Sequence, residues 1–256
     1  MIALAMKLSH LISTLDTLLK TAEINDYSGA VNGLQIENSG TITRLIAAVD
    51  ACESVIVEAA RVKGTLLIVH HGLFWNGVQP LVGTPYRKIK AAMEGDLALY
   101  SSHLPLDLHP ELGNNVLLAC ALGLTGVKPA LIMKGQSIGV IGKVKSCSRE
   151  EFSSTLSAAV GGPVHLAPGG AEKIRTVLVV SGGAGSEVAA AAKLGVDAFV
   201  TGEGPHWSYT AAEEAGLNLF YAGHYATETF GVKALAAYLS KKTGLPWSFL
   251  DHPTGL

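Results

Sequence analysis

The 256-residue sequence has few cysteines, and their arrangement excludes several kinds of site. Cys52, Cys120 and Cys147 are odd in number and include no Cys-x-x-Cys pair. This pattern argues against a disulfide framework and against a metal site built from thiolates. Any metal bound by this chain is therefore expected to use nitrogen and oxygen ligands.

The chain also lacks long apolar runs and blocks of positive charge. Hydrophobic residues make up 48% of the sequence, but no window holds the ~20 consecutive apolar residues of a membrane-spanning helix. The formal net charge is −2 and the 19 Lys and Arg residues are dispersed, which gives little support to binding of nucleic-acid phosphates. We therefore expect a small-molecule substrate, with neither a membrane nor a nucleic acid as partner.

The first 20 residues are apolar without having the features of a signal peptide. Their apolar positions recur at helical spacing among Lys7, Asp16 and Lys20, and no clear small-residue cleavage site follows. The pattern predicts an amphipathic N-terminal helix and a cytoplasmic protein. Only 16% of the residues are charged, which is in keeping with buried subunit interfaces, so we expect a homo-oligomer.

Apolar segments that alternate with helical patterns predict the α/β class. Strand-like segments occur at 44–50, 65–72, 96–107, 139–144, 163–168, 174–182, 196–204 and 217–224. The expected architecture is two α/β domains with mostly parallel sheets flanked by helices and a metal site in the cleft between them. The boundary is expected between 1–128 and 129–256, and the segment 228–256 either stays with the second domain or packs back on the first. The segment 26–40, rich in Gly, Asn, Ser and Asp, is expected to be a loop.

Polar residues gather at the carboxyl ends of the predicted strands, where parallel α/β sheets bind ligands. An isolated histidine at such a place is more often a core or surface residue than a ligand. Here several candidates converge: His70, His71, Asp107, Glu203, His206 and His224.

The His70–His71 pair closes a predicted strand immediately before Gly72. Within a regular strand neighbouring side chains face opposite ways, which would bury one histidine and expose the other. At a strand end the backbone can turn and present both rings to one site. Asp107 follows Pro105, which lacks an N–H, so we expect an extended turn that fixes the carboxylate; a helix cap or an ordinary turn residue is the alternative.

His224 and Glu228 have the sharpest spacing, because they are four residues apart where a helix is expected to begin. This spacing places both side chains on one helix face, either as two metal ligands or as a solvated ion pair. Histidines and carboxylates without cysteine suit Zn, Fe, Mn or Ni. Together with His70, His71 and Asp107 they would make five ligands, more than the three a catalytic zinc usually takes, so we expect two divalent ions per chain.

Other catalytic motifs are absent or weak. The sequence has no HExxH zinc-protease motif, no GxSxG nucleophile elbow and no Walker A loop. The glycine-rich segment 181–187 is expected to be a tight turn, with anion binding as the lesser alternative. Trp75, Trp207 and Tyr225 adjoin the candidate ligands, where they either stack on a ring-shaped substrate or belong to the core.

Five segments, in this order, resemble the Nif-three-like dinuclear metal proteins, a family also described as GTP cyclohydrolase I type 2-like. They are DYSGAVNGLQIEN, IVHHGLFW, YSSHLPLDLHPELGNN, FVTGEGPHWSYTAAEEAG and YAGHYATETFGVKAL. The resemblance spans nearly the whole chain and implies a two-domain α/β subunit in a ring-shaped hexamer whose metal sites face an internal cavity. It also implies a set of metal ligands and two further polar residues near the metals that hold the ligands or transfer protons. The implied ligands are His70, His71, Asp107, His224 and Glu228, and the further residues are His103 and His206.

The expected function is that of a dinuclear metal-dependent hydrolase acting on a nucleotide- or pterin-like small molecule, with His103 or His206 moving the proton. The resemblance supports the metal site better than it supports any reaction, so enzymatic activity stays open. One alternative is a non-enzymatic ring-shaped protein that binds or delivers metal. The other is a partner-binding scaffold whose metal stabilises the fold.

Overall fold

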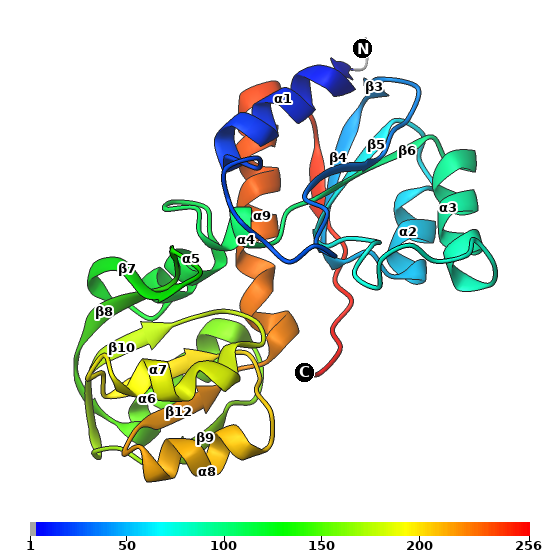
Figure 1. Ribbon diagram of the computed structural model, residues 1–256. Helices are drawn as coiled ribbons and strands as arrows, with labels where there is room; N and C mark the ends of the chain where they lie inside the picture. The colour runs from blue at the N-terminus through cyan, green and yellow to red at the C-terminus, as the bar shows by residue number, and fades with distance from the viewer. Residues whose placement is uncertain (1–3) are drawn as a thin grey trace. The chain divides into compact units, whose positions relative to one another are not determined.

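The structure, a computed structural model, describes residues 4–256, which divide into two compact units (Figure 1). The first unit contains the described residues up to Leu106 together with Gly231–His252. The second unit contains Asp107–Phe230 and Pro253–Leu256. Most of the C-terminal segment, whose membership the sequence left open, therefore belongs to the first unit.

The change of unit at 106/107 differs from the expected boundary after residue 128. Helix α5 (Asn114–Ala121) explains the difference, because its Leu118 and Ala119 are buried in the apolar core of the second unit. The sequence places this helix between two glycine-containing segments, and nothing local indicates which sheet it covers.

The first unit is built on a five-stranded sheet in the order β13-β4-β5-β6-β2. Strands β4, β5 and β6 follow one another along the chain and run parallel. Strand β13 pairs parallel with β4, and β2 pairs antiparallel with β6. The strands are β2 (Gly33–Ile36), β4 (Arg44–Asp50), β5 (Thr65–His71), β6 (Leu97–Ser101) and β13 (Trp247–Phe249). Because the carboxyl ends of parallel strands meet at one edge, residues that follow β4, β5 and β6 are brought together.

Helices cover both faces of this sheet (Figure 1). On one face, α2 (Glu53–Ala59) and α3 (Thr84–Glu94) share an apolar core with β4, β5 and β6. On the other face lie α1 (Leu8–Leu19) and the C-terminal part of α9 (His224–Thr243). Helix α1 turns one apolar stripe inward, since its leucines recur three or four residues apart and are buried: Leu8, Leu11, Leu15 and Leu19. A short antiparallel pair, β1 (Met6–Lys7) and β3 (Thr41–Ile42), precedes β4.

The second unit is built on a six-stranded sheet in the order β7-β8-β10-β11-β12-β9. Strands β10, β11 and β12 run parallel, whereas β7, β8 and β9 pair antiparallel with their neighbours. The strands are β7 (Thr125–Met133), β8 (Gln136–Ser148), β9 (His165–Pro168), β10 (Lys173–Val179), β11 (Ala198–Thr201) and β12 (Asn218–Tyr221). Parallel pairing therefore dominates the first sheet, and the second sheet is mixed.

Alternating residues of β10, β11 and β12 enter two different cores, one on each face of the second sheet. Helices α5 and α6 (Arg149–Val160) contribute to one core. The other core contains residues of α7 (Val188–Ala192) and α8 (Trp207–Glu214), and a short 3-10 helix, η1 (Ala184–Glu187), leads into α7. The predicted α/β class is thus confirmed for both units.

Five strands escaped prediction from the sequence: the short pair β1 and β3, and three strands of the larger sheets, β2, β7 and β13. Strand β2 lies in the segment 26–40, which was expected to be a loop, and β7 lies where a boundary was expected. Both are edge strands, and β7 exposes most of its side chains, so neither has the apolar run that marks a buried strand. Strand β13 follows the last helix and has only three residues. Residues 1–3 of the expected N-terminal helix lie outside the described residues, and α1 begins at Leu8.

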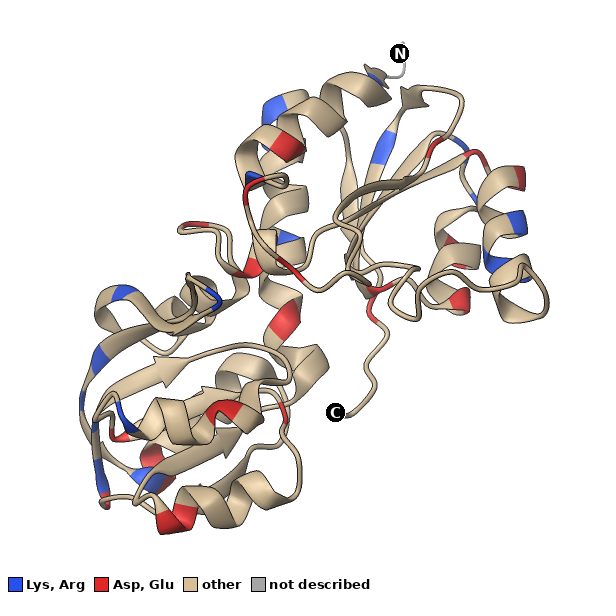
Figure 2. Ribbon diagram, viewed as in Figure 1, with Lys and Arg blue, Asp and Glu red and all other residues tan. Residues whose placement is uncertain are grey.

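Within the described part of the chain, no helix combines the length and the apolar character needed to cross a lipid bilayer. Lys and Arg residues occur together with Asp and Glu residues on both units (Figure 2). Neither unit carries charges of one sign alone, in keeping with the formal net charge of −2.

Candidate metal centre

Three histidines of the first unit lie together at the carboxyl edge of its sheet. His70 and His71 are the last two residues of β5, and His103 follows the end of β6. The ring centroid of His70 is 4.8 Å from that of His71 and 4.9 Å from that of His103. One nitrogen of each ring lies within 4.8 Å of the others, so the three could hold a metal ion. The structure therefore brings His70 and His71 to the same place and adds His103 to them.

An oxygen atom orients each of these three rings through its Nδ1 nitrogen. A carbonyl or a carboxylate only accepts hydrogen bonds, so each Nδ1 carries the hydrogen and a neutral ring keeps a lone pair on Nε2. Metal-ligating histidines are held in this way, with the second ring nitrogen donating to an oxygen. The three hydrogen bonds join His70 to the Ser102 carbonyl at 2.9 Å, His71 to Asp50 Oδ1 at 2.8 Å and His103 to Asp26 Oδ1 at 2.9 Å.

The side chain of Asp26 is buried and accepts hydrogen bonds both from His103 and from donors of its own segment. These donors are the backbone N–H of Tyr27 at 2.7 Å and Asn32 Nδ2 at 2.8 Å. Burial raises the pKa of Asp26, but the hydrogen bond and charge of His103, together with these donors, outweigh it and hold the pKa below its usual range. An ionised Asp26 therefore fixes the orientation of His103.

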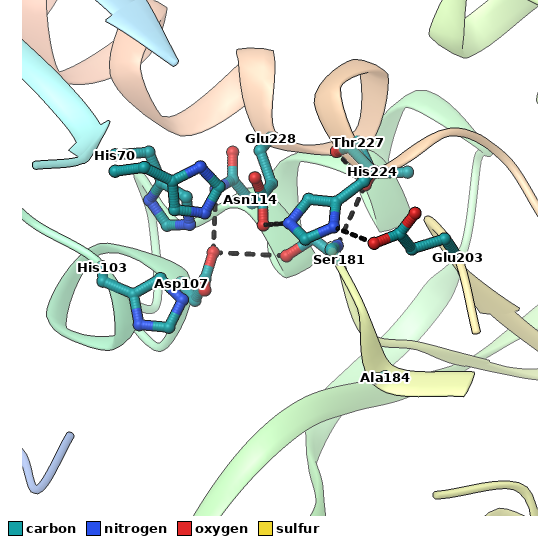
Figure 3. A network of polar contacts seen from close by, with 12 residues as sticks. His70, His103, Asp107, Asn114, Ser181, Ala184, Glu203, His224, Thr227 and Glu228 are labelled. Carbon is teal, nitrogen blue, oxygen red and sulfur yellow. Dashed lines mark hydrogen bonds and ion pairs between the residues drawn. The ribbon is translucent and has the colours of Figure 1, made fainter. Parts of the chain in front are cut away.

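In the second unit, Asp107 and a helix-borne pair, His224 and Glu228, flank the turn after β10. Asp107 Oδ1 accepts hydrogen bonds from Asn114 Nδ2 at 2.8 Å and from Ser181 Oγ at 3.2 Å (Figure 3). His224 begins α9, and its Nε2 lies 3.2 Å from Glu228 Oε1. The four-residue spacing thus places both side chains on one helix face, as predicted.

Asp107 ends a one-turn helix, α4 (Leu104–Asp107), and the prediction of an extended turn was wrong. Pro105 lies in the first turn of this helix, where the backbone N–H groups have no helical acceptor, so the missing N–H of proline is tolerated. The carboxylate is nevertheless fixed and only 8% exposed.

Two glycines give His224 and Glu228 the room they occupy. A Cβ atom at Gly182 would overlap Glu228 Oε1, and a Cβ atom at Gly202 would lie 2.5 Å from the Cα atom of His224. Gly182 also has a φ of +67°, in the left-handed region that favours glycine.

The backbone N–H groups of the glycine-rich turn, 181–187, donate hydrogen bonds to other residues of the protein. Three of them donate to neighbouring oxygens, so the expected tight turn is confirmed and these groups are not presented to an anion. The hydrogen bonds run from Gly182 to Thr227 Oγ1 at 3.0 Å, from Ala184 to Thr201 Oγ1 at 3.1 Å and from Gly185 to the Glu203 carbonyl at 3.0 Å.

His224 is unusual because both of its ring nitrogens face carboxylates (Figure 3). Its Nδ1 lies 2.9 Å from Glu203 Oε1, and its Nε2 faces Glu228. Burial lowers the pKa of His224, but hydrogen bonds and charge from Glu228, and then from Glu203, overcome burial and raise the pKa to about 9. Without a metal the ring is therefore an imidazolium at neutral pH, and a cation between Nε2 and Glu228 would replace its proton.

The second residue expected near the metals, His206, is exposed at the start of α8. Among the described residues, its side chain forms no hydrogen bond or ion pair. Glu203, three residues earlier, makes the contact with His224 instead.

Several residues that orient the candidate ligands were missed from the sequence. Asp50 ends β4 and was not among the candidates, although it stands at a carboxyl strand end as the histidines do. Asp26 gave no such signal, because it lies in an irregular segment 77 residues before His103. Glu203, which follows β11, was among the candidates, but its contact with His224 was not predicted. Asn114 lies in one of the family-like segments, but the sequence does not indicate its hydrogen bond to Asp107.

Comparisons with known proteins identify a family that matches nearly the whole chain. A family model described as Duf34/NIF3 (NGG1p interacting factor 3) matches residues 6–254. A curated protein of Deinococcus radiodurans, named GTP cyclohydrolase 1 type 2 homolog, is 40% identical over 228 residues, which cover 89% of this chain and 87% of that protein.

Two solved structures are similar over nearly the whole chain. The structure of TTHA1606 from Thermus thermophilus has a TM-score of 0.89 and 41% sequence identity, and covers 98% of this chain and 100% of its own. The structure of the protein ybgI, described as of unknown function, has a TM-score of 0.91 and 36% identity at the same coverage.

Proposed function

Because the chain belongs to the Duf34/NIF3 family, we propose that it is a dinuclear metal-dependent hydrolase acting on a nucleotide- or pterin-like small molecule. The observation that supports this most is shared by four histidines. In each, an oxygen accepts a hydrogen bond from Nδ1, the contact that fixes the orientation of metal-ligating and of proton-transferring histidines. These histidines are His70, His71, His103 and His224.

We assign five residues as ligands of two divalent ions, which are Zn, Fe, Mn or Ni: His70, His71, Asp107, His224 and Glu228. The donor set is nitrogen and carboxylate oxygen without sulfur, which suits these metals. Glu228 is 2% exposed and Asp107 8% exposed, and buried carboxylates of this kind are stabilised by a cation. When bound, two such ions would acidify a water molecule and stabilise negative charge on the reacting oxygens.

Within this proposal, His103 carries the proton. Its ring is fixed by the ionised Asp26, the same relation that orients a general-base histidine in a His–Asp pair. His206 is the second candidate, but no comparable acceptor orients it among the described residues. We expect His103→Ala to lower the turnover of a verified substrate by about 100-fold or more, with metal content retained. The role would be lost if His103→Ala and His206→Ala both left turnover unchanged.

The name shared by the curated relatives supports a nucleotide or pterin ring as the substrate class. We further propose a cytoplasmic protein that assembles as a ring-shaped homohexamer. Size-exclusion chromatography with light scattering tests the assembly, for which a mass of six chains is expected and a monomer would refute it.

The first experiment is the metal content of protein purified without chelators or affinity-tag metal. About two divalent ions per chain are expected in the wild type, with a clear loss in His224→Ala. If the wild type takes up no ion even after exposure to Zn, Fe, Mn and Ni, the proposed function is overturned.

The burial of the ligands also favours a second candidate, a protein that binds or delivers metal without catalysis. His70 is completely buried and Glu228 nearly so, and closed sites are structural whereas catalytic sites keep an open coordination position. Stoichiometric metal that exchanges with chelators but never supports hydrolysis would favour this candidate.

A further inference from the structure

An exposed aromatic ring stands beside the three histidines of the first unit. Tyr27 is 55% exposed, yet its ring centroid lies 6.0 Å from that of His103 and 6.5 Å from that of Trp75. Trp75 in turn meets His103 edge to face, with centroids 4.8 Å apart and an interplanar angle of 83°. It meets His71 in the same manner at 5.7 Å. Tyr27 and Trp75 therefore form an aromatic wall along the candidate metal ligands.

The segment that carries Tyr27 and the segment that carries Trp75 are held together by hydrogen bonds and a close backbone contact. Gln35 Oε1 accepts a hydrogen bond from the N–H of Leu73 at 2.7 Å, and Gln35 Nε2 donates to the Val31 carbonyl at 2.9 Å. A Cβ atom at Gly29 would lie 2.6 Å from the carbonyl oxygen of Trp75, so the two backbones touch there. The aromatic wall is consequently held in place before any ligand arrives.

Backbone strain shows that this loop shape is imposed by its contacts. Val31 has a φ of +42°, which is unfavourable for a β-branched residue. The indole nitrogen of Trp75 is buried, and its ring packs edge to face against His71 and His103. Trp75 is thus the inner ring of the wall, and Tyr27, which is 55% exposed, is the outer ring.

We propose that Tyr27 binds the planar heteroaromatic ring of a substrate by stacking, with Trp75 as the rigid support behind the site. This assignment rests on the proposed hydrolase function and extends it by naming the recognising residue and the ligand class, a purine- or pterin-type ring. Aromatic side chains stack on such rings whatever their substituents. A ring on Tyr27 lies next to His103, the candidate proton carrier, and a compound without a planar ring lacks this contact.

The test measures ligand binding to the metal-loaded full chain by isothermal titration calorimetry. GMP and neopterin are the ring-containing probes, and ribose 5-phosphate is the probe that has a sugar and a phosphate but no ring. Tyr27→Ala is expected to weaken binding of GMP and neopterin about 5- to 150-fold, the range for loss of one base–aromatic stack. Tyr27→Phe keeps the ring and is expected to bind within about threefold of the wild type.

Tyr86→Ala is the matched control, because Tyr86 is a tyrosine of the same unit that is 50% exposed on α3. It is expected to leave binding unchanged. The proposal is overturned if Tyr27→Ala binds both ring probes as the wild type does, if ribose 5-phosphate binds as tightly as GMP, or if no ring probe binds. Metal content and thermal unfolding of each variant are measured in parallel. A wild type that holds two ions but binds no ring refutes the stacking site alone, whereas a wild type without metal refutes the proposed function.

Discussion

His224 differs from the candidate histidine ligands of the first unit because a carboxylate faces each of its ring nitrogens. The proton on Nε2 occupies the position that a metal ion would take. A metal must therefore compete with a proton that the protein itself binds tightly, which links the metal affinity to pH.

Metal affinity is expected to rise about tenfold per pH unit from pH 7 to pH 9 and to level off above that range, because the pKa of His224 is raised to about 9. The raised pKa also stabilises the metal-free fold. That contribution is full below pH 6.5, the ordinary value, and is lost as the pH rises through about 9. Competition with a metal indicator at pH 7, 8 and 9 measures the affinity.

Glu203→Gln is the control for this pH dependence, because it removes one of the two carboxylates that raise the pKa of His224. The pKa of His224 is expected to be lower in this variant, so its metal affinity should rise and level off at a lower pH than in the wild type. Equal affinity of the wild type at pH 7 and pH 9 would show that His224 does not exchange a proton for the metal.

Gly182→Ala is expected to remove most of the bound metal and to destabilise the fold by about 1–3 kcal/mol. The new Cβ atom would overlap Glu228 Oε1, and the φ of +67° disfavours alanine. Metal analysis and thermal unfolding measure the two effects.

Gly183→Ala is a matched control one residue away. Its φ is −94°, and a Cβ atom there would have its nearest neighbour, a His224 ring atom, at 3.5 Å, an ordinary contact. This variant is expected to keep its metal. If both variants bind metal equally, the close approach at Gly182 is not needed for the site.

At the scale of single elements, the helices show how local chemistry determines where an element begins. Helix α6 starts with a capping box, in which Ser148 Oγ accepts from the Glu151 N–H at 3.1 Å and Glu151 Oε2 accepts from the Ser148 N–H at 2.8 Å. These two bonds satisfy donors that have no partner within the helix.

Ser148→Ala is therefore expected to lower the free energy of unfolding by about 1 kcal/mol. Ser154→Ala, at an exposed position on the same helix, is the control and is expected to stay within about 0.5 kcal/mol of the wild type. Urea denaturation of the metal-loaded protein measures both. Equal stabilities of the two variants would contradict the capping role of Ser148.

The elements that could be predicted from the sequence are those whose own residues show, by their apolar pattern, which sides are buried. Strands β4 and β5 are apolar on both sides because helices cover both faces of their sheet, and such runs are recognisable. Strand β2 lies at a sheet edge among turn-forming residues. Its partner β6 begins 61 positions after the end of β2 at Ile36, so β2 is a strand because of this distant pairing and not because of its own residues. The same difference separates the site residues. His70, His71, His224 and Glu228 follow local rules, whereas Asp26 acquires its role through contacts with distant residues.

At the scale of the whole molecule, metal held by the proposed ligands would stabilise the folded chain as any ligand of the native state does.

Removal of metal with a chelator is expected to lower the melting temperature. Free metal at about 100 times its dissociation constant contributes about 2.7 kcal/mol, which corresponds to about 5–10 °C for a chain of this size. Differential scanning fluorimetry with and without chelator measures the shift. His224→Ala should show a much smaller shift, and an equal shift in wild type and variant would place the stabilising metal elsewhere.

The discontinuity of the first unit sets an order for folding during synthesis. The segment Asp107–Phe230 contains every strand of the second unit, so its sheet can close as soon as this segment has left the ribosome. The first sheet waits longer, because β13, which pairs with β4, lies at Trp247–Phe249. The unit that is translated first is thus completed after the second unit, and the edge of β4 stays unpaired until β13 has been synthesised. A nascent chain stalled after Phe230 would expose that edge to pairing with other chains, the feature that makes partly synthesised β-sheets prone to aggregate.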